Sequence, residues 1–152
     1  MAKFSDYLEV KLLNHIFRED TYAHPQKIFI GLFTVAPADA LGTPTGEVLS
    51  TSSWSNYGRV DAANGDGLTT TANTITGWEV PNATGGSTSN AKVITFAANN
   101  GATAITIKGI GIFDGNSTAA NLLFHSLLAT EKTLLTGDVL SFGENSITVT
   151  LA

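Results

Sequence analysis

The stretch that decides the fold runs from Asn121 to Leu128 and reads Asn-Leu-Leu-Phe-His-Ser-Leu-Leu. Successive side chains of an extended chain point to opposite faces, so the even-numbered residues of this stretch share one face and the odd-numbered residues share the other. Both faces are mainly apolar, and the turn residues Asp114-Gly115-Asn116 precede the stretch. The pattern predicts a strand here and indicates that the chain is built from β-structure.

Further strands are expected on both sides of this stretch. Downstream, Val139 to Phe142 and Ser146 to Leu151 are separated by Gly143-Glu144-Asn145, which predicts a terminal hairpin. Upstream, Gly109 and Gly111 lie in an apolar run and indicate a bulge or a close approach of backbones. The other expected strands are Lys27 to Thr34, Tyr57 to Ala62, Thr74 to Val80, Ala91 to Ala97, and Thr103 to Lys108 continuing through Gly109 to Phe113.

One helix is expected, from Phe4 to Phe17. Ser5 is suited to cap its first turn, and the helix is expected to end near Arg18. Residues 1–20 either pack on the rest of the domain or act as an arm that lies across a neighbour. Apolar residues recur at four-residue intervals, the spacing of a helical stripe, at Leu8, Leu12 and Ile16.

These elements predict a mainly β fold. The 152 residues fit a single domain, residues 1–152. About seven or eight short strands, without the alternation of strands and helices that marks a parallel sheet, predict an antiparallel β-sandwich. We expect this sandwich to be jelly-roll-like and to carry one N-terminal α-helix.

Composition excludes several classes of function. Thr, Ser, Asn and Gly make up 58 of the 152 residues, and the formal net charge is −5, so no nucleic-acid partner is expected. The absence of cysteine excludes disulfides, thiolate metal sites and cysteine nucleophiles. The first residues lack the apolar core of a signal peptide, and no window is apolar enough for a membrane helix, so neither a secretory signal nor a membrane partner is expected.

No catalytic site is expected either. His125 and Ser126 are neighbours on a predicted strand, so their side chains point to opposite faces and cannot form a nucleophile–base pair. The three histidines show no metal-ligand spacing. We therefore expect no enzymatic activity, cofactor or metal site. A glycan hydrolase that uses an unspecified pair of carboxylates is kept as an alternative.

Three aromatic residues are the candidate partner interface. Trp54, Tyr57 and Trp78 lie in a weakly patterned region rich in Ser, Asn, Thr and Gly. Aromatic residues in such regions are enriched where a protein grips another protein or a glycan. Filling of the core is the alternative, because a sandwich of this size needs large side chains.

Several segments together carry a family resemblance. They are Phe4 to His15, Ile28 to Thr34 followed by Ala36-Pro37, Gly109 to Asp114 leading to Asn121 to His125, Thr136 to Phe142, and Ile147 to Leu151. In this order they resemble a family of short virion proteins of tailed bacteriophages, whose members are often labelled tail-fibre proteins. The resemblance skips roughly Leu41 to Asn90, apart from Tyr57-Gly58-Arg59-Val60, where the family tends to have Gly-Tyr-Ala-Arg.

This resemblance implies a structural role in the virion. Some similar small β-sandwich proteins are capsid cement or decoration proteins, which clamp neighbouring major capsid subunits from outside the shell. The leading hypothesis is therefore a cement protein on the capsid exterior, made in the host cytoplasm, with the major capsid protein and itself, as a trimer, for partners. The alternative is a tail-fibre or baseplate-associated protein that binds a host glycan or receptor through the three aromatic residues.

Overall fold

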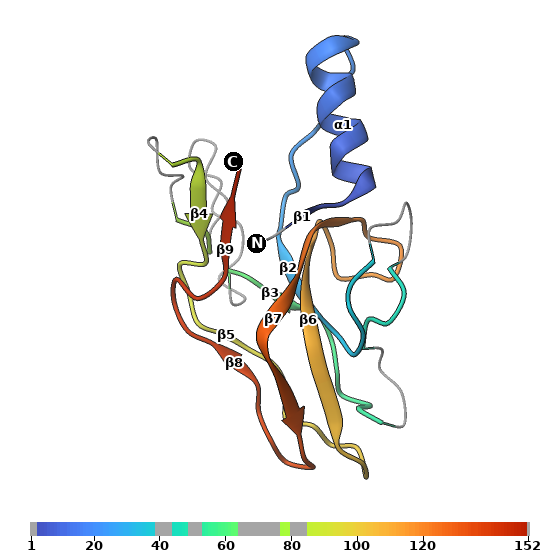
Figure 1. Ribbon diagram of the computed structural model, residues 1–152, viewed down its shortest axis with the longest axis vertical. Coiled ribbons are helices and arrows are strands. Elements are labelled where there is room, and N and C mark those ends of the chain that lie inside the picture. Colours follow the sequence, from blue (N-terminus) through green and yellow to red (C-terminus); the bar gives the residue numbers. More distant parts are fainter. Residues whose placement is uncertain (1–2, 39–43, 49–52, 64–76, 80–84, 152) are drawn as a thin grey trace.

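The computed structural model describes residues 3–38, 44–48, 53–63, 77–79 and 85–151. Over these residues the chain is mainly β, all its strand pairs are antiparallel, and its single helix lies near the N-terminus, which confirms the predicted fold class (Figure 1). The expected strand from Thr74 to Val80 lies largely outside the described residues. The elements are β1 (Lys3–Phe4), α1 (Asp6–Phe17), β2 (Phe29–Phe33), β3 (Val60–Asp61), β4 (Ser87–Ser89), β5 (Ile94–Thr95), β6 (Ile105–Phe113), β7 (Leu122–Leu134), β8 (Ser141–Phe142) and β9 (Thr148–Thr150).

One large sheet and two short ladders form the sandwich. The large sheet has the strand order β1-β7-β6-β2-β3 and stays open, with β1 and β3 at its edges. The ladders β4–β9 and β5–β8 face it (Figure 1). Ile30 and Ile112 from the sheet and Ile94 and Val149 from the ladders belong to one buried cluster. The main core therefore lies between the sheet and the ladders.

Strand β7 departs from the strict alternation that its sequence predicts. Ile112 pairs with Phe124, but the next residue of β6, Phe113, pairs with Leu122, so Leu123 is an extra residue in the ladder. Leu123 joins the main core, whereas Leu122 joins a second, smaller cluster with Phe113. The prediction that Leu122 shares a face with Phe124 is therefore wrong, because a bulge reverses the faces at this point.

The glycines of β6 mark both a bulge and a close approach, as predicted. The register between β6 and β7 shifts between Ile107 and Gly109. Gly111 pairs with Gly31 of β2, and a methyl group on Gly111 would lie 2.8 Å from the ring of Phe33. A side chain at this position would displace the aromatic rings that pack over the sheet.

The predicted terminal hairpin is wrong. Strand β8 pairs with β5 and strand β9 pairs with β4, so the last two strands diverge to separate ladders. The buried Asn90 takes the hydrogen bonds that a hairpin would have used: its side-chain amide donates to the carbonyl of Gly143 at 2.8 Å and accepts from the amide of Ile147 at 2.8 Å. Its backbone carbonyl accepts from the amide of Asn145. A residue far away in sequence thus replaces the local partner.

Helix α1 ends where the sequence predicts, but it begins at Asp6, two residues later than expected, because Phe4 belongs to β1. Ser5 is the N-cap, and its hydroxyl oxygen accepts a hydrogen bond from the amide of Leu8 at 3.3 Å. The same hydroxyl donates to the carbonyl of Leu122 in β7. Arg18 is the C-cap, and its amide donates to the carbonyl of Asn14. The cap therefore joins the first turn of the helix to the large sheet.

Substitution Ser5→Ala is expected to lower the free energy of unfolding by about 1–2 kcal/mol, because it leaves a buried helix N-terminus without its acceptor. Urea denaturation followed by circular dichroism measures this loss. The control is Ser141→Ala, at an exposed serine whose hydroxyl lies 2.9 Å from that of Thr95; we expect a change within about 0.5 kcal/mol, because water replaces this exposed contact. Equal losses for the two variants would contradict the role of Ser5 as a cap.

Candidate functional site

Two of the three predicted interface residues lie in the core. Trp54 is fully buried, and its indole N–H donates to the carbonyl of Ala98 at 3.2 Å. The ring of Tyr57 lies 5.3 Å from that of Trp54 and stacks on Phe96 at 6.1 Å. Trp54 and Tyr57 therefore fill the core, in agreement with the alternative interpretation, and neither ring is available at the surface of the folded chain.

The third predicted residue, Trp78, is only partly buried. It packs against the main core, and its backbone forms an isolated bridge with Asn90. It lies in the short described segment 77–79. The structure thus brings Trp54 and Tyr57 into ring contact and places Trp78 on a separate segment.

The hydroxyl of Tyr57 completes the edge of strand β2. Strand β3 pairs only with Phe29 and Ile30, so the backbone beyond them needs other partners. The amide of Leu32 donates to the Tyr57 hydroxyl oxygen at 2.8 Å, and the carbonyl of Leu32 accepts from the amide of Val48 at 2.7 Å. Burial raises the pKa of Tyr57 above its ordinary value, so this hydroxyl stays protonated.

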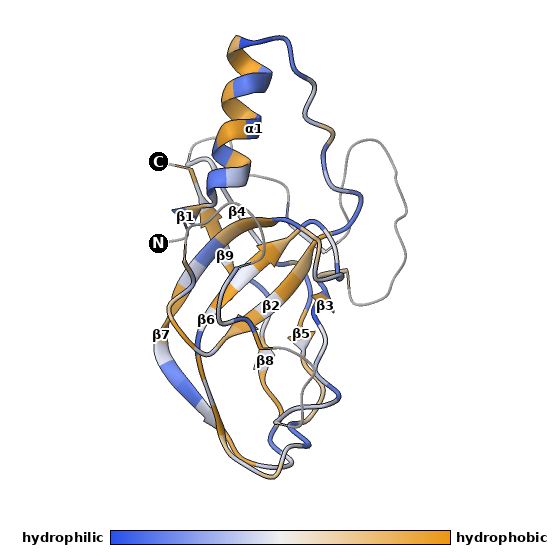
Figure 2. Ribbon diagram, turned by 90° about the vertical axis from the view of Figure 1, so that its right-hand side faces the viewer, coloured by the Kyte–Doolittle hydropathy of each residue, from blue (hydrophilic) through white to orange (hydrophobic). Residues whose placement is uncertain are grey.

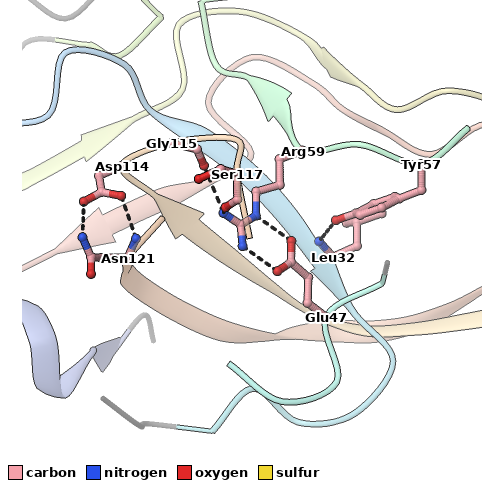
Figure 3. A network of polar contacts seen from close by, with 8 residues as sticks. All are labelled: Leu32, Glu47, Tyr57, Arg59, Asp114, Gly115, Ser117 and Asn121. Carbon is pink, nitrogen blue, oxygen red and sulfur yellow. Dashed lines mark hydrogen bonds and ion pairs between the residues drawn. The ribbon is translucent and has the colours of Figure 1, made fainter. Parts of the chain in front are cut away.

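A buried ion pair lies beside this edge (Figure 3). The Arg59 guanidinium donates to both carboxylate oxygens of Glu47, with both distances 2.7 Å, and each side chain is 4% exposed. The remaining guanidinium nitrogen donates to the carbonyls of Gly115 and Ser117. The Arg59 guanidinium carbon also lies 3.5 Å from the ring centroid of Phe113, a cation–π contact. Every guanidinium nitrogen of Arg59 therefore has a partner.

A second pair, Asp114 and Asn121, joins the two ends of the loop whose carbonyls accept hydrogen bonds from Arg59 (Figure 3). Both carboxylate oxygens of Asp114 accept hydrogen bonds at 2.7 Å from Asn121, one from its backbone amide and one from its side-chain amide. This contact joins the end of β6 to the start of β7. Together the two pairs hold residues 114–121 against the Arg59 side chain.

This network has the chemistry of a structural clamp. The Glu47 carboxylate accepts two short, charge-assisted hydrogen bonds from Arg59, so both of its oxygens already have partners within the fold. The pairing of Glu47 with Arg59 was not predicted from the sequence. The signal that could have found Arg59 was the patch Tyr57-Gly58-Arg59-Val60, which interrupts an otherwise weakly patterned region.

The histidines do not gather into a site. His15 and His24 are exposed, and their Nδ1 atoms lie at hydrogen-bond distance from the backbone carbonyls of Asp20 and Pro25. His125 is buried in β7 opposite Gly111. Across the described residues, no group of three or more His, Asp or Glu side chains could hold a metal ion. None of the helices in that part of the chain is long or apolar enough to cross a bilayer.

A half-open cavity of about 160 Å³ lies between β7 and the segment that carries β8 and β9. Its wall combines polar and apolar groups, and the apolar ones include Ile112, Phe124, Phe142 and Val149. Ser126 and Ser146 supply polar groups at its margin. The cavity is smaller than most small-molecule sites, which are about 300–1,000 Å³.

The most conspicuous surface is the outward side of α1. Val10, Leu13, Ile16 and Phe17 are 47%, 56%, 66% and 76% exposed, whereas Leu8 is 5% exposed against the body. Figure 1 shows α1 projecting beyond the strands at one end of the molecule, and Figure 2 shows its apolar bands. Single exposed apolar residues are common, but four on one short helix form a patch that indicates contact with another molecule. Of the two expectations for residues 1–20, the side of the helix that carries Leu8 and Leu12 packs on the domain, while the opposite side stays exposed.

Two tyrosines, Tyr7 in α1 and Tyr22 after it, lie near enough to the carboxylate of Asp114 to feel its charge. Burial, together with the nearby charge of Asp114, raises the pKa of Tyr7. Burial, Tyr7 and Asp114 together raise the pKa of Tyr22 to about 12. Both phenols therefore favour the neutral form in the folded chain.

We expect the folded protein to lose stability as the pH rises from 10 to about 12. The unfolded chain releases its tyrosine protons near pH 10.0, whereas the folded chain holds that of Tyr22 up to about pH 12. The folded state binds more protons in this window, so the stabilisation is complete below pH 10.0 and is lost as the pH rises. A phenolate absorbance titration of native and urea-unfolded protein tests this. Coinciding titration curves would contradict the prediction.

The fold and these sites define the class: a small antiparallel β-sandwich with a buried arginine clamp and a projecting apolar helix. A protein-family model described as "Podophage GP4 fiber I protein gp80" matches residues 3–150. Because this match covers nearly all 152 residues, the chain belongs to that family. It is thus a virion protein of a short-tailed phage, of the kind labelled tail fibre, which confirms the resemblance found in the sequence. A search of the curated proteins finds no match.

Proposed function

We propose that this chain is a non-catalytic structural part of a virion fibre, and that it joins the particle through protein–protein contacts. The observation that carries this proposal is the outward side of α1, where four large apolar side chains are about half or more exposed on a helix that projects from the sandwich. An apolar patch of this kind stabilises a folded protein when a partner covers it. The family description, which names a fibre, supports the same role.

Other features of the described residues are consistent with a structural, non-catalytic role. The polar network of Glu47 and Arg59 is saturated by its own partners. Low charge and many small polar residues suit a broad surface that contacts other proteins without chemistry. We also propose that the chain has no enzymatic activity.

The second candidate role is that of a capsid cement protein on the head. A cement protein would use the same kind of apolar contact to bind neighbouring major capsid subunits from outside. It would stabilise the assembled shell by binding it in preference to free subunits. Fibre and cement roles differ in the location and number of copies on the particle.

Immunogold electron microscopy of purified particles, combined with quantitative mass spectrometry of copy number, tests the placement. Label at the tail with few copies per particle supports the fibre proposal. Label over the head with hundreds of copies would replace it by the cement role. Purified wild-type particles in which the protein is undetectable would overturn both. Particles assembled without the protein should lose adsorption if it is a fibre, and resistance to heat or osmotic shock if it is a cement protein.

The role of α1 in joining the particle is tested with the variant Phe17→Glu, supplied during infection in place of the native chain. We expect this variant to fold and to be depleted from purified particles. The control is Leu135→Glu, which changes an equally apolar residue that is 60% exposed but lies outside α1. Equal incorporation of both variants would contradict the role of α1.

A further inference from the structure

We infer that the cavity between β7 and β9 receives an extended, uncharged segment of another protein of the particle. This segment adds to the free edge of β7 and places one large apolar side chain in the cavity. The site lies on the sandwich and does not use the exposed side of α1. The inference therefore goes beyond the proposed function and shares with it only the requirement that the chain is on the particle.

The cavity lies against the edges of strands rather than on the face of a sheet. Successive side chains of a strand point to opposite faces, so a cavity on one face contacts every second residue. Here consecutive residues line the cavity on both sides, 124–129 of β7 on one and 146–149, which lead into β9, on the other. The cavity therefore opens between two strand edges, the place where an extended chain can enter.

In the part of the chain that the structure describes, the outer edge of β7 has no strand partner beyond His125. Strand β1 pairs only with Phe124 and His125, although β7 continues to Leu134. Where β1 does pair, its Phe4 ring packs on the ring of Phe124 with centroids 5.1 Å apart. The fold thus already uses this edge to hold a short strand with an apolar side chain, and the free edge continues directly from it.

The backbone groups of Leu127 point outward from this edge. The carbonyl of Leu123 accepts a hydrogen bond from the amide of Ser5 at 2.9 Å, on the side away from β6. Backbone groups of alternate residues in an antiparallel ladder point to the same side, so those of Leu127 point away from β6 as well. The Leu127 carbonyl accepts a hydrogen bond from the neighbouring Ser126 hydroxyl at 3.1 Å. An incoming strand can replace this local contact with a ladder hydrogen bond.

The other half of the β7 edge is protected against pairing. Natural sheets protect their edges with bulges and charged side chains. The register of β7 on β6 shifts between Ile107 and Gly109, and Glu131 and Lys132 follow on β7. Residues 126–129 carry neither a charge nor a proline. The edge is therefore protected over its second half and left open beside the cavity.

The size and charge of the cavity define its occupant. A cavity of about 150 Å³ holds one benzene ring, so the volume of about 160 Å³ matches one large apolar side chain. None of the described residues that line it is Asp, Glu, Lys or Arg, which matches an uncharged segment. Strand addition of this kind takes affinity from main-chain hydrogen bonds and specificity from side-chain pockets.

Another protein fits this site better than a second copy of the chain does. The described strands already pair within the fold. A second copy would have to unpair one of them before donating it, and this would cost the copy part of its own sandwich. A segment that is extended before it binds carries no such cost.

The first test is photocrosslinking in intact particles. Leu127 lines the cavity and is 60% exposed, so it tolerates a replacement and lies beside the expected occupant. The full chain with Leu127→p-benzoylphenylalanine is supplied during infection, and purified particles are irradiated. We expect a covalent product with a different virion protein, identified by mass spectrometry. The matched control is the same replacement at Leu135, also 60% exposed, which should give no such product.

The second test places a charge beside the cavity. Ala129 is exposed and lines the cavity. Adding Ala129→Asp to the crosslinking chain should lower the yield of the Leu127 product by about 10-fold or more, because the added segment would bury a carboxylate. The matched control is Ala119→Asp, at an exposed alanine of the loop 114–121, which should leave the yield unchanged. Unchanged circular dichroism shows that each variant is folded.

Three outcomes would overturn the inference. They are no crosslinked product from Leu127, a product that contains only a second copy of this chain, and equal yields with Ala129→Asp and Ala119→Asp. Where Ala129→Asp alters circular dichroism, the Leu127 product decides alone. Absence of the chain from particles counts against the proposed function, whereas its presence without the crosslink counts against this inference and leaves the proposed function standing.

Discussion

Replacing Arg59 with methionine should lower the free energy of unfolding by about 3–5 kcal/mol, because the substitution leaves the Glu47 carboxylate buried without its partner. Glu47 is 4% exposed, so water cannot replace the two hydrogen bonds that it loses. The carbonyls of Gly115 and Ser117 lose their donor as well. Urea denaturation followed by circular dichroism measures the loss.

The matched control is the exposed ion pair between Lys108 and Glu131, whose side chains are 42% and 57% exposed and 3.6 Å apart. Lys108→Met should change the free energy of unfolding by no more than about 1 kcal/mol, because solvent screens this pair. A double variant, Arg59→Met with Glu47→Leu, should be more stable than Arg59→Met alone, since no buried charge remains. Equal effects of Arg59→Met and Lys108→Met would contradict the buried clamp.

Replacing Trp54 with alanine should lower the free energy of unfolding by a comparable amount, about 3–5 kcal/mol. Trp54 is the largest fully buried side chain of the described residues, and it contacts Tyr57. Its removal leaves a cavity in the centre of the core and a carbonyl, that of Ala98, without its donor. Circular dichroism in urea is the suitable measurement, because the substitution removes one of the two tryptophan fluorophores.

Two variants separate a core role of Trp54 from an interface role. Trp54→Phe keeps most of the ring and should cost less than Trp54→Ala. Val139→Ala, at a residue that is 53% exposed, should change stability by no more than about 0.5 kcal/mol. If Trp54→Ala folded with native stability and only failed to join particles or bind host cells, the interface interpretation of this residue would be correct instead.

Local signals in the sequence were enough for the helix and for the long strands. The cap at Ser5 and the end at Arg18 depend on residues within one turn of the chain, so they could be predicted. The apolar runs of β2, β6 and β7 likewise carry their own signal. The glycines of β6 predicted a bulge because glycine weakens the interior of a strand and is commonly kept there only where the ladder is irregular or backbones approach closely.

Long-range partners account for what the sequence did not predict. The terminal hairpin failed because Asn90, 57 residues before Ile147, takes its hydrogen bonds. The clamp of Glu47 and Arg59 depends on the loop after β6, which no local pattern connects to either residue. The apolar stripe of α1 was visible, but whether it is buried or exposed depends on where the helix meets the sheet.

Folding of this chain has to wait for partners that are synthesised late. Lys3 pairs with His125, and residues 87–89 pair with residues 148–150. Chains dominated by such distant pairings fold slowly, on the order of milliseconds to seconds. Until residues 141–150 leave the ribosome, β4 and β5 have exposed edges that can pair with other nascent chains. Rapid synthesis of this protein is therefore expected to favour aggregation, and its yield should depend on temperature and on chaperones more than its small size suggests.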